Sequence, residues 1–234
     1  MALIRIENLK KHYVSGDETV EALRGVDLAI EAGEFVTIMG QSGSGKSTLL
    51  SVLGGMNHPT AGSVDMAGVK LYELSGERLA DFRAEHLGFV FQSFHLIQYL
   101  TALENVMLPL AITGMKKGEK VQAAREALQR VGLAGKADRL PSQLSGGEQE
   151  RVAIARAIVK KPPILLADEP TGNLDTKTSE EVMALFRRLN DEGQTVVMVT
   201  HNPENCAYAD RTIVLRDGLI ISEQEDAVTT RSAA

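Results

Sequence analysis

Residues 40–47 read Gly-Gln-Ser-Gly-Ser-Gly-Lys-Ser, and this stretch decides the fold. It fits the pattern G-x-x-x-x-G-K-[ST] in full and stands between an apolar run, 34–39, that predicts a strand and a segment, 46–54, that predicts a helix. Glycines let backbone N–H groups turn toward phosphate oxygens, and the helix N-terminus adds its positive dipole. We therefore predict a phosphate-binding loop. Its predicted nucleotide-binding residues are Gly40, Gln41, Ser42, Gly43, Ser44, Gly45, Lys46, Ser47 and Thr48.

Two side chains of this loop carry most of its chemistry. The ammonium of Lys46 can bridge the outer phosphates, and the hydroxyl of Ser47 can bind Mg²⁺. The alternative is a flexible turn rich in glycine and serine, but chance rarely places the Lys-Ser pair and both flanking elements together. We therefore expect ATP and Mg²⁺ as ligands.

A second apolar run, 164–168, predicts a strand that ends in two carboxylates. The carboxyl ends of strands are where ligands bind in open α/β sheets. We expect Asp168 to hold Mg²⁺, and Glu169 to orient and deprotonate the water that attacks the γ-phosphate. An acidic turn at a strand end is the alternative, and the phosphate loop upstream disfavours it.

His201 follows another apolar run, 195–200, which also predicts a strand. It should therefore emerge on the same sheet edge as Asp168. A lone histidine is more often a surface or structural residue, but this placement favours a catalytic one. We expect His201 to bond the γ-phosphate and to steady Glu169 or the water.

Strands and helices alternate around these motifs, which is typical of a mainly parallel α/β sheet. Alternating apolar residues at 3–9 and 22–30 predict an N-terminal antiparallel β subdomain. Helical periodicity from 75 to 160 predicts an inserted α-helical subdomain. We expect a single domain over 1–234, with a catalytic α/β core at about 1–90 and 160–222, the helical subdomain at about 93–159 and a polar tail at 223–234.

Composition restricts the function. The chain has 234 residues, of which 44% are hydrophobic and 24% charged, as in ordinary globular proteins. A net charge of -6 gives no basic surface that would concentrate the protein on nucleic acid, so we expect no nucleic-acid partner. The only cysteine, Cys206, cannot form an internal disulfide. No stretch approaches the ~18 apolar residues that span a bilayer, so we expect neither secretion nor membrane insertion.

Residues 144–148, Leu-Ser-Gly-Gly-Glu, precede another predicted helix. Ser145 and Glu148 fit a capping box, which explains these two residues. It does not explain the glycines between them, because each costs about 1 kcal/mol in a helix unless the backbone approaches something closely. We therefore expect Ser145, Gly146 and Gly147 to bind a phosphate at this helix N-terminus.

With both motifs, the chain resembles the ATP-binding-cassette (ABC) ATPases, because 144–148 matches their signature motif and lies upstream of the Asp168-Glu169 strand as theirs does. The resemblance extends from about Ile4 to Ser222. It implies a P-loop NTPase core of the RecA-like type and hydrolysis of ATP. It also implies a homodimer in the ATP-bound state, in which the signature of one subunit completes the ATP site of the other.

The resemblance implies roles for further residues. Tyr13 resembles the aromatic residue that stacks on adenine, and Gln92 resembles the loop glutamine that contacts Mg²⁺ and senses the membrane partner. The segment Asn173-Leu174-Asp175 resembles the loop that crosses between subunits. Taken alone, Tyr13 is a strand-end surface residue and Gln92 a polar loop residue. Gln41 departs from the family, in which proline is common at this position. Because the loop should bind phosphate through its backbone, we expect it to tolerate this glutamine.

Residues 168–175, residues 101–106 and the lack of an extra C-terminal domain resemble the lipoprotein-release and macrolide-export branch of the family. Members of that branch drive bacterial permeases that pull on periplasmic partners. The resemblance therefore implies a separate transmembrane permease. It also implies a cytoplasmic protein that is held at the cytoplasmic face of the inner membrane through this permease. A cell-division regulator ATPase stays open as an alternative. A DNA-maintenance ATPase is less favoured, because no heptad pattern is sustained.

Apolar residues crowd around Gln92, more than a solvated loop needs. They are Phe89, Phe91, Phe94, Leu96, Ile97, Tyr99 and Leu100. The resemblance implies a groove here for a short cytoplasmic helix of the permease. We predict that a charge at Leu96 or Tyr99 uncouples the ATPase from the permease and leaves nucleotide binding intact.

Overall fold

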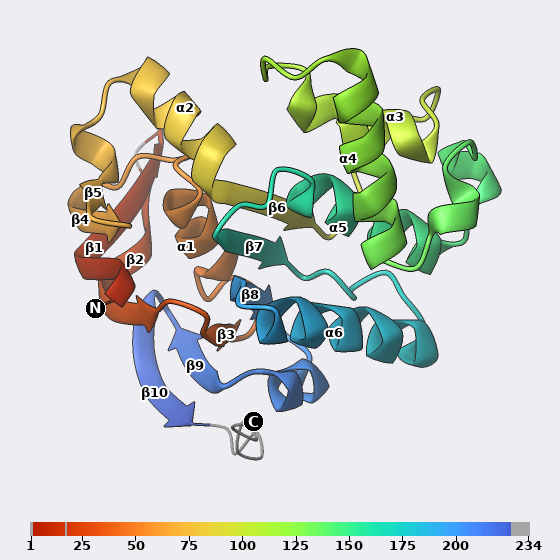
Figure 1. Ribbon diagram of the computed structural model, residues 1–234. Coiled ribbons are helices and arrows are strands. Elements are labelled where there is room, and N and C mark those ends of the chain that lie inside the picture. Colours follow the sequence, from red (N-terminus) through yellow and green to blue (C-terminus); the bar gives the residue numbers. More distant parts are fainter. Residues whose placement is uncertain (1, 17, 226–234) are drawn as a thin grey trace, which may run out of the picture.

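The computed structural model describes residues 2–16 and 18–225, and the strands of this part of the chain form two sheets (Figure 1). The strands are β1 Ala2–Ser15, β2 Glu18–Glu31, β3 Phe35–Met39, β4 Ala61–Met66, β5 Val69–Lys70, β6 Leu87–Phe91, β7 Ile164–Asp168, β8 Thr195–Thr200, β9 Arg211–Arg216 and β10 Leu219–Glu225. The smaller sheet is antiparallel, with the order β2-β1-β4-β5. The larger sheet has the order β10-β9-β3-β8-β7-β6, and only β10 runs antiparallel to its neighbour.

Helices cover the larger sheet and form a separate lobe. The helices are α1 Lys46–Leu53, α2 Gly76–His86, α3 Ala102–Met107, α4 Lys117–Arg130, α5 Gly146–Ile158 and α6 Thr176–Asp191, with 3-10 turns η1 Leu71–Glu73, η2 Leu108–Leu110, η3 Ala134–Lys136, η4 Pro141–Gln143 and η5 Pro203–Tyr208. In Figure 1 the lobe that contains α3 and α4 stands beside the sheets. Within the described residues, no helix has both the length and the apolar character that a membrane crossing requires.

Both faces of the larger sheet are buried, as β7 illustrates. Ile164 and Leu166 pack in a core with α1, α2 and the smaller sheet. Leu165 and Ala167 pack in a second core with α5, α6 and the helical lobe. Because successive side chains of a strand point to opposite faces, an uninterrupted apolar run is what a strand buried on both faces needs.

The register of the central strands brings the predicted motifs together. β3, β8 and β7 are parallel neighbours, in which Met39 pairs with Thr200 and Asp168 with Val199. Their carboxyl ends therefore lie at one edge of the sheet. This edge carries the phosphate loop, Glu169 and His201, and the expected α/β fold is confirmed.

Two segments differ from the sequence prediction. Strand β6, which pairs with β7, was not predicted, because it lies in the segment after residue 75 that has helical periodicity. A short apolar run there does not distinguish a strand from a buried helix. At the other end, β10 extends to Glu225 and takes in the start of the expected polar tail. An edge strand is held by backbone pairing, here with β9, so it does not need apolar side chains. Residues 226–234 lie outside the described residues.

Candidate functional site

The phosphate loop joins β3 to α1 and leaves the first turn of that helix without a side-chain cap. Gly45 is the N-cap residue, with a φ of 104°. A Cβ at Gly45 would lie 2.4 Å from the carbonyl oxygen of Ala22, so only glycine fits. The N–H groups of the first turn are therefore available to an anion.

Lys46 is buried and holds the loop together. Its Nζ donates to the carbonyl oxygens of Gly40 at 2.7 Å and Gln41 at 3.0 Å. The same Nζ lies 4.0 Å from Oε1 of Glu169, so one ammonium joins the loop to the carboxylate after β7. This arrangement places the Lys46 ammonium beside the open N-terminus of α1, where a triphosphate can bind.

Ser47 and Asp168 form a pair of oxygen ligands. The Ser47 hydroxyl donates to Oδ1 of Asp168 at 3.2 Å. Burial, and secondarily the charge of Glu169, raise the pKa of Asp168. A nearby cation would reverse that effect. One hydroxyl and one carboxylate fit Mg²⁺, which takes few protein ligands and completes its shell with phosphate and water oxygens.

Glu169 has an unusual backbone conformation that aims its carboxylate. Its φ is 46°, a left-handed value that is uncommon for residues other than glycine and is found often at functional sites. Its N–H donates to the carbonyl oxygen of Val199 at 3.0 Å. Its Oε2 lies 2.8 Å from Nδ1 of His201. The two predicted catalytic side chains are thus in direct contact.

A cavity of about 760 Å³ opens beside these groups. Its lining is drawn from the phosphate loop, the segments after β7 and β8, and strands β9 and β10. Glu169 and His201 both face it, and α5 contributes no residue to it. The structure therefore does not bring the predicted second phosphate site, Ser145, Gly146 and Gly147, into the same cavity.

The N-terminus of α5 is capped internally. The N–H of Ser145 donates to Oε2 of Glu148 at 2.9 Å, and the N–H of Glu148 donates to the Ser145 hydroxyl at 3.3 Å, so the capping box is present. A Cβ at Gly147 would lie 2.2 Å from Cγ2 of Thr178. Close packing against α6 thus explains this glycine without a ligand. The contact joins residues that are far apart in the sequence, so it was not predicted.

Gln92 lies where the loop after β6 meets the loop after β7. The Asn173 amide donates to the carbonyl oxygen of Gln92 at 3.0 Å. A Cβ at Gly172 would lie 2.9 Å from Nε2 of Gln92, so this side chain rests against the backbone that follows Glu169. In the next residues, Asp175 caps α6 by accepting hydrogen bonds from the N–H and hydroxyl of Thr178.

Tyr13 lies near the end of β1 and is 39% exposed. The Asn57 amide donates to its hydroxyl at 3.4 Å. The ammonium of Lys11 lies 5.0 Å from the ring centroid. The ring is thus held beside the segment that follows α1, with surface available for stacking.

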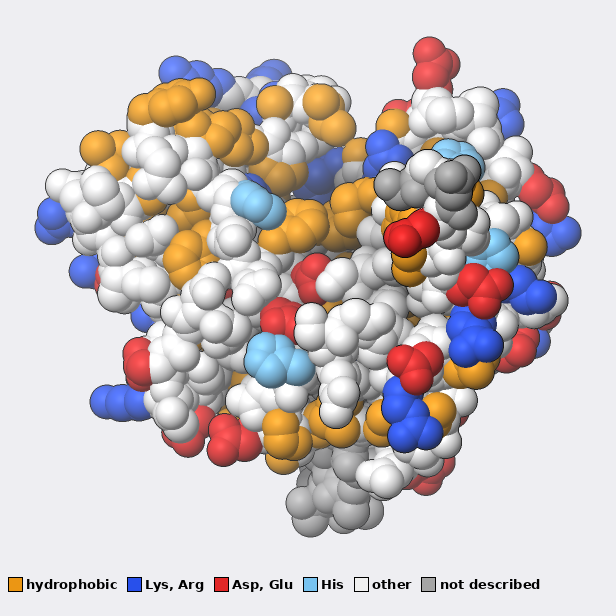
Figure 2. All heavy atoms as spheres, turned by 180° about the vertical axis from the view of Figure 1, so that it is seen from behind, with side chains coloured by type: hydrophobic (Ala, Val, Ile, Leu, Met, Phe, Trp, Pro, Cys, Tyr) orange, Lys and Arg blue, Asp and Glu red, His pale blue; other side chains and the backbone are white. Residues whose placement is uncertain are grey.

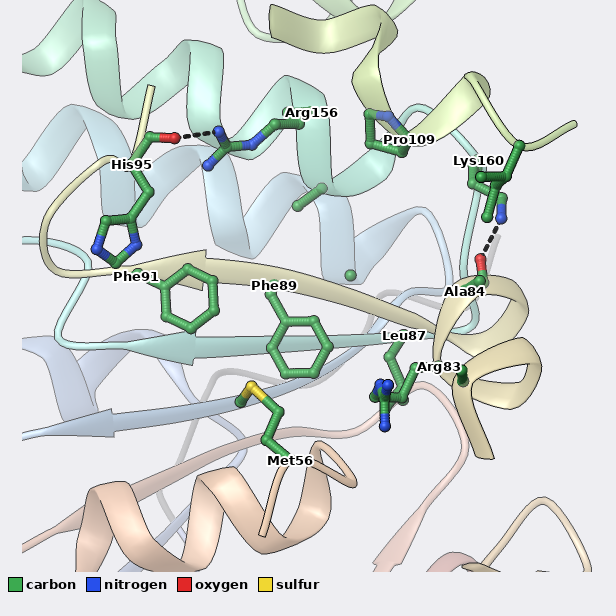
Figure 3. A pocket seen from close by; sticks show the side chains of 14 residues that line it. Met56, Arg83, Ala84, Leu87, Phe89, Phe91, His95, Pro109, Arg156 and Lys160 are labelled. Carbon is green, nitrogen blue, oxygen red and sulfur yellow. Dashed lines mark hydrogen bonds between the residues drawn. The ribbon is translucent and has the colours of Figure 1, made fainter. Parts of the chain in front are cut away.

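A groove of about 570 Å³ separates α2 and β6 from the helical lobe. Figure 3 shows its apolar floor of Met56, Phe89 and Phe91 and three cations, Arg83, Arg156 and Lys160, around it. The aromatic residues were predictable from the sequence, whereas the cations, which are far apart along the chain, were not predicted. In Figure 2, hydrophobic side chains gather in the hollow between the lobes.

The expected effect of a charge at Leu96 needs correction. Leu96 is 7% exposed and belongs to the core that contains α5, so a charge there would destabilise the fold. Tyr99 is 81% exposed and remains suitable for that test.

The comparisons with known proteins agree with this geometry. A family model described as "ABC transporter" matches residues 23–172. The chain is 48% identical over 231 residues to the macrolide export ATP-binding/permease protein MacB of Rhodopirellula baltica; the match covers 97% of this chain and 34% of that protein, so the chain spans about a third of its length. It is 47% identical over 225 residues to the uncharacterized ABC transporter ATP-binding protein YvrO of Bacillus subtilis, covering 96% of this chain and 98% of YvrO.

Solved structures give the same result over the whole fold. The dimeric structure of MJ0796, a bacterial ABC transporter cassette, is similar with a TM-score of 0.88 at 47% identity, over 95% of this chain and 98% of that chain. A post-hydrolysis dimer of MJ0796 bound to ADP and Pi gives a TM-score of 0.87 at 45% identity, with the same coverage. The chain therefore belongs to the ABC transporter family.

Proposed function

We propose that this cassette binds ATP with Mg²⁺, closes as a head-to-tail homodimer and thereby drives a separate membrane permease of the lipoprotein-release or macrolide-export type. The observation that supports this function best is the meeting of Lys46, Asp168, Glu169 and His201 at one edge of the larger sheet. Lys46 follows β3 through the phosphate loop, Asp168 and Glu169 stand together at the end of β7, and His201 follows β8. Each group is of the type that phosphoryl transfer to water requires.

The phosphate loop provides binding in this proposal. The open N–H groups at the start of α1 and the Lys46 ammonium hold the β- and γ-phosphates. Ser47, Asp168 and Gln92 would hold Mg²⁺, which would supply positive charge to neutralise the phosphate oxygens. Tyr13 stacks on adenine, with Lys11 beside its ring.

Glu169 and His201 act on the attacking water. The Glu169 carboxylate accepts the water's proton, a contribution of roughly 10²- to 10⁴-fold to the rate. His201 lies 2.8 Å from that carboxylate and fixes its orientation. The exposed His201 ring can also contact the γ-phosphate, because 61% of its side chain is accessible.

The second half of the site comes from a second copy of the chain. Ser145, Gly146 and Gly147 do not line the cavity beside the phosphate loop of their own chain. MJ0796, which is similar over the whole fold, is dimeric. We therefore assign these residues to the γ-phosphate of the partner's ATP, and Asn173, Leu174 and Asp175 to the contact between subunits.

The replacement Glu169→Gln tests the catalytic role. This variant should bind ATP with unchanged affinity, lose turnover by at least about 100-fold and accumulate as an ATP-bound dimer. Light scattering after size exclusion, with and without Mg-ATP, measures the dimer, and phosphate release measures turnover. Wild-type protein under the same conditions is the control. Normal turnover in the variant would remove Glu169 from this role.

The groove beside β6 is the proposed docking site of the permease. None of Arg83, Arg156 and Lys160 forms an ion pair with a described carboxylate; they donate to the backbone carbonyls of Gly55, of Phe94 and His95, and of Ala84. Of the three cations, Arg156 also interacts electrostatically with the buried Glu150 carboxyl group. Three cations around an aromatic floor, in a chain of net charge -6, fit a short amphipathic helix with acidic side chains.

Charge reversal tests the docking site. Lys160→Glu should weaken copurification with the permease about tenfold and leave ATP binding unchanged, because like charges then face each other across the groove. The control is Lys70→Glu, which reverses an exposed charge on the smaller sheet, outside the groove. Equal copurification of the two variants would contradict an acidic partner helix.

A further inference from the structure

A buried amide links the two segments that carry Glu169 and His201. Asn205 lies in η5 and is 2% exposed. Its Nδ2 donates to the hydroxyls of Thr171 and Thr200, each at 3.0 Å. Both threonines are buried, and each lies close in sequence to a predicted catalytic residue: Thr171 follows Glu169-Pro170, and Thr200 immediately precedes His201.

The link closes a small network around the turn after β8. The Thr200 hydroxyl also accepts a hydrogen bond from the N–H of Asn202 at 3.0 Å, and the Asn202 carboxamide accepts from the N–H of Glu204 at 3.0 Å. This network fixes the path of the chain on both sides of His201. Since a buried amide without partners is costly, the two threonine hydroxyls also hold Asn205 in place.

We infer that Asn205 is a positioning residue for ATP hydrolysis, which keeps the Glu169 carboxylate and the His201 ring in register with each other. The left-handed backbone of Glu169 makes such support necessary, because a strained conformation persists only where its surroundings hold it. Asn205 lines neither the cavity beside the phosphate loop nor the groove, so its effect passes through the two threonines. The inference rests on the proposed roles of Glu169 and His201.

Replacing Asn205 with leucine tests the inference, because leucine is of similar size and makes no hydrogen bond. Asn205→Leu should lower kcat for ATP about 10- to 100-fold, the effect of a small misplacement of a catalytic group, and change KM less than twofold. KM should hold because Lys46 and the phosphate loop are untouched. A kcat within twofold of wild type, or a rise in KM as large as the fall in kcat, would overturn the inference.

The same hydrogen bond can be removed from its other end. Thr171→Val deletes the hydroxyl with little change of shape, and Thr171→Ser keeps the hydroxyl. Thr171→Val should reproduce the fall in kcat and Thr171→Ser should retain near wild-type rates, a difference that a purely steric role would not produce. If Asn205→Leu fails to fold, the comparison of Thr171→Val with Thr171→Ser still tests the inference. Equal rates for these two variants would overturn it.

Two further comparisons separate this inference from the proposed function. In the double variant Asn205→Leu/Thr171→Val the losses should not add, because Asn205→Leu already breaks the hydrogen bond that Thr171→Val removes, together with the one to Thr200. Fully additive losses count against the link. Glu169→Gln serves as the reference. If Glu169→Gln turns over normally, the proposed base is wrong; if it is inactive while Asn205→Leu is active, only the positioning role fails.

Discussion

Two helix N-termini in this protein were both predicted to bind phosphate, and they are built in opposite ways. The N-terminus of α1 has a glycine N-cap, no acidic residue in its first turn and a buried lysine. The N-terminus of α5 has a complete capping box, and its Glu148 carboxylate is ion-paired with Lys136 at 3.2 Å. Hydrogen bonds from Ser145 and Lys136 lower the pKa of Glu148, so it is ionised.

The contrast suggests different tasks. The open terminus of α1 is incomplete without an anion, whereas the capped terminus of α5 is stable without one. Because the N–H groups at the α5 terminus are capped within their own subunit, this terminus keeps its conformation without a ligand. It can then bind the nucleotide of a second subunit without rearranging. One terminus would hold ATP throughout the cycle, and the other would recognise it only when two copies close.

Removing the lysine of the α1 terminus should have the largest effect. Lys46→Ala deletes the ammonium that binds the Gly40 and Gln41 carbonyls, so the affinity for Mg-ATP should fall about 100-fold. Titration calorimetry measures the affinity. Ser145→Ala is the matched change at the α5 terminus, and it should leave the affinity of the isolated subunit within twofold. Equal losses in the two variants would mean that both termini bind ATP within one chain.

Mixing two inactive variants tests whether each site is shared between subunits. Lys46→Ala breaks the α1 terminus and Ser145→Arg blocks the α5 terminus. In a head-to-tail dimer of the two variants, one ATP site carries both defects and the other carries neither. About half of the dimers in a 1:1 mixture are of this mixed kind, and one of the two sites in each is intact, so the mixture should regain about a quarter of the wild-type rate. The unmixed variants are the controls. A mixture as inactive as its components would argue against sites built from two chains.

The glycine of the α5 terminus should matter for stability. Gly147→Ala introduces a Cβ that would lie 2.2 Å from Cγ2 of Thr178, and overpacking of this kind should cost about 1–3 kcal/mol of unfolding free energy. Urea denaturation measures the loss. Adding Thr178→Ser removes the clashing methyl group, keeps the hydroxyl that binds Asp175 and should restore most of the stability. No restoration would point to a cause other than this contact.

The smallest effect concerns a carboxyl group within α5. Glu150 is 0% exposed, neither of its carboxylate oxygens has a hydrogen-bond partner in the described structure, and burial raises its pKa well above the usual 4.5. Glu150→Met should therefore stabilise the protein by about 1 kcal/mol at neutral pH. Such a gain raises Tm by about 2–4 °C in scanning calorimetry. A lower Tm for the variant would show that the attraction between Glu150 and Arg156 outweighs the cost of burying the carboxyl group.

The pH dependence of this effect has a definite sign. The folded protein keeps the Glu150 proton to a higher pH than the unfolded chain does, so wild-type stability should fall as pH rises above about 4.5, through the range where only the unfolded carboxyl group is ionised. The advantage of Glu150→Met should shrink toward pH 4. Glu150→Gln, which cannot ionise, should also lack this pH dependence.

Several features were predictable because their cause lies within a few residues. Glycine spacing, a lysine and a serine suffice to specify the phosphate loop, and a buried strand that ends in Asp168-Glu169 specifies a polar edge. The capping box of α5 was predictable for the same reason, since Ser145 and Glu148 bond across one turn. The uninterrupted apolar runs of β7 and β8 also predicted that both faces of these strands are buried.

Other features depend on residues that are remote in sequence, and only the folded chain brings these together. The packing of Gly147 on Thr178, the amide of Asn205 between Thr171 and Thr200, and the cations around the groove at β6 all arise from contacts between separate elements. Strand β6 was missed because its short apolar run becomes a strand only by pairing with β7. The sequence by itself predicts which residues carry the chemistry, because their motifs are local. The contacts that position these residues form between segments that are remote in the sequence, so only the folded structure shows them.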